Sequence, residues 1–274
     1  MTDLSKLKTG FRYIRNKQKI RTFINNPWKA SWKYVHILEN KAAYKFSWMD
    51  GLLFELSKER LYRIMKREES LEDILSTAFN CDVGYWSYRS IRPTQIPSEI
   101  KQLAKEVKEL SPRIVLEIGT GNGGTLYIWS RYLETCQQII TIDLPGGPFG
   151  GGYPQTKIKF FKLFAPNKKL FLLRGNSHSK EIYRRVSQIL KHDKVDFLFI
   201  DGDHRYEGVK QDFEIYCKLI GSEGIVAFHD IVPGPPEKVG GVPRFWDEIK
   251  SDFSYIEIVK DWKQGGYGIG VIYI

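Results

Sequence analysis

Cysteine is scarce in this chain of 274 residues, and long apolar runs are missing from it. The three cysteines, Cys81, Cys136 and Cys217, are far apart and odd in number, which speaks against a disulfide framework and against a cysteine-based zinc site. No apolar run approaches the roughly 18 residues that a membrane-spanning helix needs. The first residues also lack the apolar stretch of a secretory signal, so the expected compartment is the cytoplasm.

Excess charge is missing from most of the sequence. Residues 69–274 carry 26 Lys/Arg and 26 Asp/Glu, whereas residues 1–68 carry 16 and 6, so the whole net charge of +10 lies in the first quarter. A total of 42% hydrophobic residues is too high for a disordered chain and suffices for a core. Because the remaining three quarters are electrostatically neutral, the basic balance does not make the whole protein a nucleic-acid binder.

Residues 1–94 are predicted to be a basic, aromatic-rich helical extension, with a helical apolar stripe over Leu52–Met65. For residues 1–68 we favour a helical lid over an acceptor site. The alternatives are an amphipathic anchor that contacts an anionic membrane, an arm that stacks on and neutralises nucleic acid, and a contact in a homo-oligomer. The last two are favoured less than the membrane anchor. The expected localisation is cytoplasmic, with association with a membrane as the alternative.

Residues 95–274 alternate between short apolar strands and helices. The predicted strands are Arg113–Ile118, Gln138–Ile142, Lys169–Leu173, Val195–Ile200, Gly224–Phe228, Tyr255–Val259 and Gly268–Ile274, the last two as an antiparallel pair. The predicted helices are Thr125–Leu133, Lys180–Leu190, Tyr206–Leu219 and one that Ser98 caps and that runs to about Leu110. This alternation predicts an α/β domain with a doubly wound, mostly parallel seven-stranded sheet behind an N-terminal helical extension.

Two loops rich in glycine and proline follow predicted strands, at residues 144–155 and 232–243. Open α/β sheets bind ligands at the carboxyl ends of their strands. We therefore expect both loops to complete the pocket of an acceptor molecule.

The strongest motif is VLEIGTGNGGT, Val115–Thr125, which reads as a strand, a glycine turn and the start of a helix. Glycines let the backbone pass close to a ligand, and the helix N-terminus offers N–H donors to an anionic group. Glu117 stands inside the apolar strand, and Asp143 ends the next strand, where a carboxylate can accept both hydroxyls of a ribose. Two alternatives are a tight turn without a ligand and an NAD-type site, since Gly119, Gly121 and Gly124 also satisfy G-x-G-x-x-G.

The sequence resembles the class I S-adenosylmethionine (SAM)-dependent methyltransferases over about Gln95–Ile274. The resemblance rests on the glycine motif, on ITIDLP, on FLFIDGDHRYEGVKQDFE and on GIVAFHDIVP. The last two blocks resemble macrocin-type sugar O-methyltransferases and cephalosporin hydroxylase-like proteins, and more distantly catechol O-methyltransferases. The resemblance implies a SAM site in which Asp143 holds the ribose and Asp201 lies near cofactor and acceptor. It also implies that Glu117, Gly119, Gly121 and Thr125 surround the methionine part of the cofactor and that Ser177 and His178 border the adenine. The remaining implied cofactor contacts are Thr120, Gly123 and Asn176.

The acceptor chemistry is assigned to two loops that follow adjacent strands. Methyl transfer to oxygen needs a group that removes the hydroxyl proton, and a divalent cation can make that proton more acidic. By resemblance, His204 is the candidate base and Asp201, His229 and Asp230 are the candidate metal ligands. The metal-dependent relatives carry two carboxylates, or Asp-Asn, where this chain has His229-Asp230, so magnesium, a transition metal and no metal all stay open. His204 and His229 have a purely structural alternative as hydrogen-bonding caps.

Three acidic residues near this motif are given structural roles. Asp203 is predicted to be the N-cap of the helix that begins near Arg205. Asp212 and Glu214 lie inside that helix and are predicted to be on its solvated face.

The sequence thus predicts a SAM-dependent O-methyltransferase acting on a hydroxyl of a sugar-like or natural-product small molecule, with or without a metal. The alternatives are an NAD-dependent oxidoreductase and a non-catalytic Rossmann-like protein whose basic arm binds RNA or anionic membrane.

Overall fold

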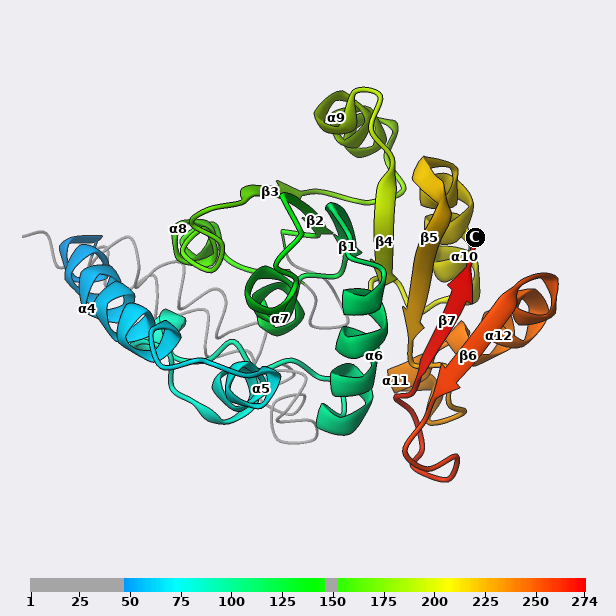
Figure 1. The fold of residues 1–274 in the computed structure, drawn as a ribbon, viewed down its shortest axis with the longest axis horizontal. Coiled ribbons are helices and arrows are strands. Elements are labelled where there is room, and N and C mark those ends of the chain that lie inside the picture. Colours follow the sequence, from blue (N-terminus) through cyan, green and yellow to red (C-terminus); the bar gives the residue numbers. More distant parts are fainter. Residues whose placement is uncertain (1–46, 146–151) are drawn as a thin grey trace, which may run out of the picture. The chain divides into compact units, whose positions relative to one another are not determined.

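The computed structural model describes residues 47–145 and 152–274 (Figure 1). The chain divides into two compact units, residues 1–52 and 53–274, and the whole sheet lies in the second. Most of the basic segment, for which a lid, a membrane anchor, a nucleic-acid arm and an oligomer contact were considered, lies outside the described residues, as do residues 146–151 of one predicted acceptor loop. Among the helices that are described, none has the length and apolar character needed to cross a bilayer.

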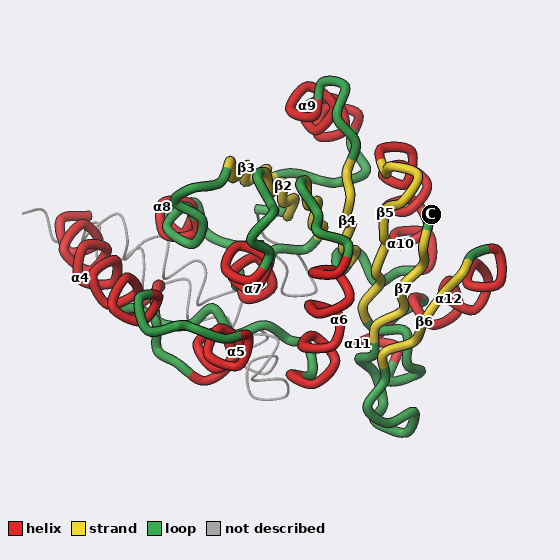
Figure 2. The backbone as a smooth tube through the Cα atoms, viewed as in Figure 1, coloured by secondary structure: helices red, strands yellow, loops and turns green. Residues whose placement is uncertain are grey.

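A seven-stranded sheet with the order β3-β2-β1-β4-β5-β7-β6 forms the centre of the second unit (Figure 2). Strands β1 to β5 run parallel to one another, whereas β7 is antiparallel to both β5 and β6. The predicted fold class is confirmed. The strands are β1 (Ile114–Ile118), β2 (Gln138–Asp143), β3 (Lys169–Arg174), β4 (Val195–Ile200), β5 (Ile220–His229), β6 (Ser254–Ile258) and β7 (Ile269–Tyr273).

Helices cover both faces of the sheet because its central strands are apolar on both sides. Successive residues of a strand point to opposite faces, and in β1 Val115 belongs to one hydrophobic cluster and Leu116 to another. The first cluster packs α5 (Leu71–Asn80), α6 (Pro97–Glu109), α7 (Gly124–Tyr132) and α8 (Lys157–Phe161) against the sheet, together with residues of α4 (Ser47–Met65) from Leu61 on. The second packs α9 (Lys180–Leu190), α10 (Tyr206–Tyr216) and α12 (Val242–Ile249). Three short 3₁₀ turns and α11 complete the elements: Trp86–Tyr88, Cys217–Leu219, Lys250–Asp252 and Pro236–Val239.

Several predicted bounds differ from those of the structure, and two of the differences have a clear physical reason. Ser98 does not cap α6, because the helix begins at Pro97 with Ile96 in the N-cap position. Proline suits the first helical position, since its fixed φ is helical and its missing N–H would have had no partner there. Strand β5 begins at Ile220, four residues before the predicted start. The prediction missed this first part because it includes the exposed residues Ser222 and Glu223 and lacks an apolar pattern.

Candidate active site

A pocket of about 760 Å³ opens at the carboxyl ends of β1, β2, β4 and β5. The register explains the convergence: Ile118 pairs with Ile142 on one side and with Ile200 on the other, and Ile200 pairs with Phe228. The residues that follow these four positions must therefore lie at one edge of the sheet. Ten of the predicted site residues line the pocket: Gly119, Gly121, Asp143, Asn176, Ser177, His178, Asp201, His204, His229 and Asp230.

The glycine turn and Asp143 form one wall of this pocket. Asp143 Oδ2 accepts a hydrogen bond from the Gly121 N–H at 2.7 Å, and Oδ1 accepts one from the Leu144 N–H at 2.7 Å. Burial raises the pKa of the Asp143 carboxyl, and these two N–H groups with that of Gly152 oppose the rise. Because each carboxylate oxygen has a second acceptor site, the side chain can still receive hydroxyl groups from a ligand in the pocket.

Four further predicted contacts are buried and do not line the pocket: Glu117 of β1, Thr120 and Gly123 of the turn, and Thr125 of α7. Glu117 is fully buried and accepts hydrogen bonds from Trp129 Nε1 and from Thr141 Oγ1, each at 3.1 Å. The hydroxyls of Thr120 and Thr141 are themselves hydrogen-bonded to each other. These hydrogen bonds hold the turn from behind, and cofactor contact by Glu117 and Thr125 stays a prediction.

Burial raises the pKa of Glu117 from 4.5 to about 7, although hydrogen bonds from Thr125, Thr141 and Trp129 oppose the rise. The folded protein therefore holds a proton that the unfolded chain loses above about pH 4.5. This contribution to stability is complete below that pH and is lost as the pH rises through about 7. Since a tenfold change in proton affinity is about 1.4 kcal/mol, the loss amounts to roughly 3 kcal/mol.

We expect Glu117→Gln to remove this pH dependence. Urea unfolding at pH 5 and pH 8 checks it: the wild type should lose roughly 3 kcal/mol more than the variant between the two values. Glu109→Gln, at an exposed position near the end of α6, is the control and should retain the wild-type pH dependence. Parallel curves for wild type and Glu117→Gln would contradict the assignment.

The segment Asn176–His178 follows β3 and borders the pocket where the adenine contacts were predicted. The His178 ring turns toward α10: its Nε2 lies 3.1 Å from Asp212 Oδ1 and 3.2 Å from the Gly208 carbonyl oxygen. The bond to Asp212 raises the pKa of His178, against the effect of burial. The prediction that Asp212 is solvated was wrong, because its side chain is fully buried beside His178, whereas Glu214 is exposed as predicted.

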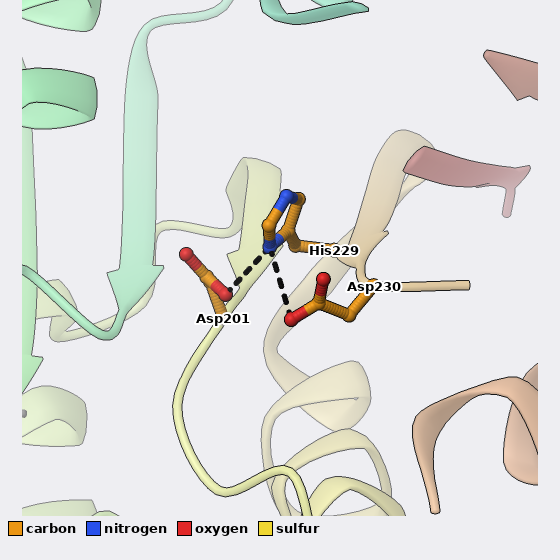
Figure 3. A group of neighbouring side chains, drawn as sticks. All are labelled: Asp201, His229 and Asp230. Atoms are coloured by element: carbon orange, nitrogen blue, oxygen red, sulfur yellow. Dashed lines mark hydrogen bonds and ion pairs between the residues drawn. The ribbon is translucent and has the colours of Figure 1, made fainter. Parts of the chain in front are cut away.

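Asp201, His229 and Asp230 come together at the ends of β4 and β5 (Figure 3). His229 Nδ1 lies 3.0 Å from Asp201 Oδ1 and 3.5 Å from Asp230 Oδ2. His229 and Asp230 are buried, and Asp230 has a left-handed backbone with φ +66°. This backbone conformation costs energy for a residue with a side chain. Residues that adopt it often lie at functional sites.

The three side chains perturb one another electrostatically. Burial alone would raise the pKa of the Asp201 carboxyl, yet the nearby His229 and His204 hold it well below its usual range. Burial would also lower the pKa of His229, but the two carboxylates raise it well above its usual value. Strongly shifted groups that share a pocket are typical of functional sites.

The donor set fits a divalent cation. One ligand atom from each of Asp201, His229 and Asp230 lies within 4.8 Å of the other two. Two carboxylate oxygens with one imidazole nitrogen suit manganese, iron or zinc better than magnesium, which prefers oxygen ligands. His229 Nε2, on the far side of the ring, is buried and has no hydrogen-bond partner among the described residues, so Nδ1 is the nitrogen that faces the carboxylates.

His204 borders this cluster and stands 25% exposed. Its Nε2 lies 3.5 Å from Asp201 Oδ1, and its Nδ1 lies 2.6 Å from the Lys238 carbonyl oxygen. Burial would lower the pKa of His204, but the bond to Asp201 and the charges of Asp201 and Asp230 raise it to about 9.

The N-cap of α10 is Arg205, and Asp203 is not the capping residue that was predicted. The Asp203 carboxylate still accepts a hydrogen bond from the Arg205 N–H at 3.0 Å and pairs with the Arg205 guanidinium. Asp203 thus lies two residues before the cap and orders the turn that carries His204.

Several lining residues escaped sequence reasoning. Gly265, Gly266 and Tyr267 of the β6–β7 loop and Thr94 before α6 border the pocket. Glu237 and Lys238 also border it, and these two lie in the loop at 232–243 that was predicted to complete the pocket. A signal was present in the first of these segments, because QGGYG is as rich in glycine as the cofactor turn. This segment lies beside the pocket because β7 inserts between β5 and β6. The sequence predicts that the last two strands pair with each other, but it does not predict their position in the sheet.

Comparison with known proteins agrees with this geometry. Residues 116–231 match a family described as a methyltransferase domain. Over these residues the chain is similar to a methyltransferase domain. The antiparallel β7 between β5 and β6 also departs from the strand order of dinucleotide-binding folds, against the NAD alternative.

Two solved structures resemble the methyltransferase fold of this chain. An O-methyltransferase of Bacillus cereus in complex with SAH is 20% identical, with a TM-score of 0.50, and the match covers 76% of this chain and 92% of the other. The O-methyltransferase TomG of Streptomyces achromogenes, in complex with SAM, is 17% identical, with a TM-score of 0.52, and the match covers 76% and 90%. At these identities the similarity establishes the fold and leaves the substrate open.

Two curated relatives share part of the sequence. An uncharacterised protein of Acanthamoeba polyphaga mimivirus is 47% identical over 117 residues, which are 42% of this chain and 50% of that protein. An uncharacterised protein of Sinorhizobium fredii is 25% identical over 146 residues, which are 52% of this chain and 16% of that protein. The matched region thus spans half or less of each relative.

Proposed function

We propose that the protein transfers the methyl group of SAM to a hydroxyl oxygen of a sugar-like or natural-product small molecule. One observation carries the proposal: a single pocket holds the glycine turn with Asp143 and, on adjacent strands, the cluster Asp201, His229 and Asp230. A pocket of about 760 Å³ falls in the range of small-molecule sites and gives room for a cofactor together with part of an acceptor.

In the proposed reaction the acceptor oxygen forms a bond to the methyl carbon while the sulfur–methyl bond breaks, and its electron pair stays on sulfur to give SAH. The hydroxyl proton passes to a base, for which the neutral form of His204 is the candidate, beside Asp201. A divalent cation, when held by Asp201, His229 and Asp230, would supply Lewis acidity toward the hydroxyl. Asp143 and the turn would fix the cofactor so that the two reacting atoms meet in line.

The acceptor class is supported by the polar side chains near this cluster. Four separate segments contribute to the same pocket: they carry Thr94, Arg205, Tyr267 and the adjacent pair Glu237 and Lys238. Such donors and acceptors suit a molecule with several hydroxyl groups. The resemblance of the Asp201 and His229 motifs to macrocin-type sugar O-methyltransferases points the same way.

A labelled-methyl assay tests this function. SAM carrying an isotopic methyl group is incubated with the full chain and a panel of glycosides and hydroxylated natural products, with added Mn²⁺ or with a chelator. We expect an O-methylated product whose rate falls at least about tenfold on chelation. His204→Ala should lose about two orders of magnitude in rate, as is typical when a general base is removed.

Each arm of the assay can fail separately. Product formation that is insensitive to the chelator would remove the metal from the proposal. Wild-type turnover by His204→Ala would end its assignment as base. If the purified chain shows no affinity for SAM or SAH, the enzyme assignment itself fails.

A further inference from the structure

A short segment before the matched methyltransferase region contacts the Asp201 cluster directly. Gln95 is only 5% exposed, and its Nε2 donates a hydrogen bond to Asp201 Oδ2 at 2.7 Å. Since an ionised carboxylate only accepts hydrogen bonds, the amide nitrogen has to face Asp201. The amide oxygen Oε1 then points the other way, and it is buried with no hydrogen-bond partner among the described residues. This arrangement leaves one buried polar atom without a hydrogen bond, which costs free energy. Such an atom in a folded protein needs an explanation, and a functional role of the contact with Asp201 is one.

The bond from Gln95 determines which oxygen of Asp201 is available to the cluster. With Oδ2 held by Gln95, Oδ1 is the atom that faces His229 Nδ1 at 3.0 Å and His204 Nε2 at 3.5 Å. Rotation of the carboxylate would break the hydrogen bond to Gln95. The amide thus fixes the orientation of one of the two acidic side chains.

Glu99 lies one helical turn further along, on α6, and is almost fully buried. Its carboxylate accepts three hydrogen bonds from the β6–β7 loop. Oε1 receives the Lys260 N–H at 3.0 Å and Gln264 Nε2 at 2.8 Å, and Oε2 receives the Gly268 N–H at 3.0 Å. One side chain therefore closes both ends of a loop whose middle residues, Gly265 to Tyr267, line the pocket.

The loop in turn holds the second acidic side chain. The Tyr267 N–H donates to Asp230 Oδ1 at 2.9 Å, and the Tyr267 carbonyl accepts from the Val232 N–H at 2.9 Å. Asp230 and Tyr267 both have left-handed backbones, with φ +66° and +62°. Two neighbouring residues with this strained backbone need surrounding contacts that hold them in place. Within residues 47–145 and 152–274, Glu99 is the only carboxylate that accepts the adjacent Gly268 N–H.

We infer that Gln95 and Glu99 are positioning residues for the candidate metal centre: Gln95 orients Asp201, and Glu99 orients Asp230 through the β6–β7 loop. This inference rests on the proposed metal-assisted function. It places the determinants of the centre on a segment that belongs to neither the glycine turn nor the strands that carry the ligands. Partners that orient metal ligands in this way usually change metal affinity by 10- to 100-fold when they are replaced.

The test compares Gln95→Leu and Glu99→Gln with wild type in the full chain. Binding of Mn²⁺ alone is followed by electron paramagnetic resonance of the free ion, and binding of SAH is followed by calorimetry. We expect each variant to lose about 10- to 100-fold in Mn²⁺ affinity while SAH affinity stays within about threefold. Ile100→Val, which shortens a buried apolar side chain of the same helix, is the matched control for a loss of packing.

Hydrogen exchange gives a readout that needs no metal. Glu99→Gln should speed amide exchange in residues 260–268 and leave β4 and α10 unchanged. The inference is overturned if Mn²⁺ affinity in both variants equals that of Ile100→Val, or if SAH and Mn²⁺ affinities fall together. If wild type binds no Mn²⁺, the metal assignment fails and the Gln95 part falls with it. The Glu99 part is then decided by exchange alone, and unchanged exchange in residues 260–268 overturns it.

Discussion

Asp143→Ala is expected to weaken SAH binding by one to three orders of magnitude. The substitution removes the acceptor of the Gly121 and Leu144 N–H groups, each held at 2.7 Å, and leaves the glycine turn without its cross-strand tie. It also removes the carboxylate proposed to receive the ribose hydroxyls. Hydrogen bonds to a charged group contribute about 1.5–3 kcal/mol each, so the loss of one or two of them accounts for this range.

Calorimetry with SAH measures the effect, and two further variants make it specific. Asp143→Asn keeps the shape of the side chain but places an amide against one N–H donor, so an intermediate loss is expected. Asp193→Ala removes an exposed carboxylate from the turn after α9 and should bind like wild type. Affinity within a factor of two of wild type for Asp143→Ala would remove Asp143 from the cofactor site.

Much of the fold follows from local sequence because each buried element carries its own apolar pattern. The bounds of β4 and α9 were predicted to the residue, since VDFLFI is apolar except for Asp196 and Lys180–Leu190 has a clear amphipathic period. The proximity of Asp201 to His229 also followed from sequence, because parallel strands end at one edge. The 3.0 Å between His229 Nδ1 and Asp201 Oδ1 confirms that the two loops meet.

Long-range polar contacts were missed because they have no local signature. Gln95 and Asp201 are 106 positions apart, and Glu99 and Gly268 are 169 apart, so no pattern in either segment indicates the partner. Asp212 is a different case. The spacing of Val209, Asp212 and Tyr216 places all three on one helical face, and that face is buried. Here the periodicity was readable, and the acidic residue type outweighed it in the prediction.

The backbone at Gly119 gives the second large expected effect. A β-carbon built there lies 2.0 Å from the Asp201 carbonyl oxygen, and the residue has φ +98°. The backbone is held at both residues. The Gly119 N–H donates to the Ile142 carbonyl at 2.9 Å, and the Asp201 N–H donates to the Ile118 carbonyl at 2.8 Å. Gly119→Ala must therefore separate β1 from β4 at the pocket edge.

We expect Gly119→Ala to lower the free energy of unfolding by on the order of 3 kcal/mol or more, since about 1–2 kcal/mol comes from the left-handed backbone alone and the clash adds to it. Gly121→Ala is the comparison within the same turn. No atom lies within 4 Å of a β-carbon at Gly121, which has φ +50° and lines the pocket. Its methyl group should cost only about 1 kcal/mol of stability but should reduce SAH affinity by occupying ligand space.

Urea unfolding and SAH calorimetry on both variants separate the two roles. The expected pattern is a loss of stability at Gly119 and a loss of binding with modest destabilisation at Gly121. Equal stability of the two variants would show that the Asp201 carbonyl oxygen lies farther from Gly119 than the 2.0 Å to a built β-carbon implies. Unimpaired SAH binding by Gly121→Ala would place the cofactor elsewhere in the pocket. The turn and Asp201 would then lose the shared geometry on which in-line methyl transfer depends.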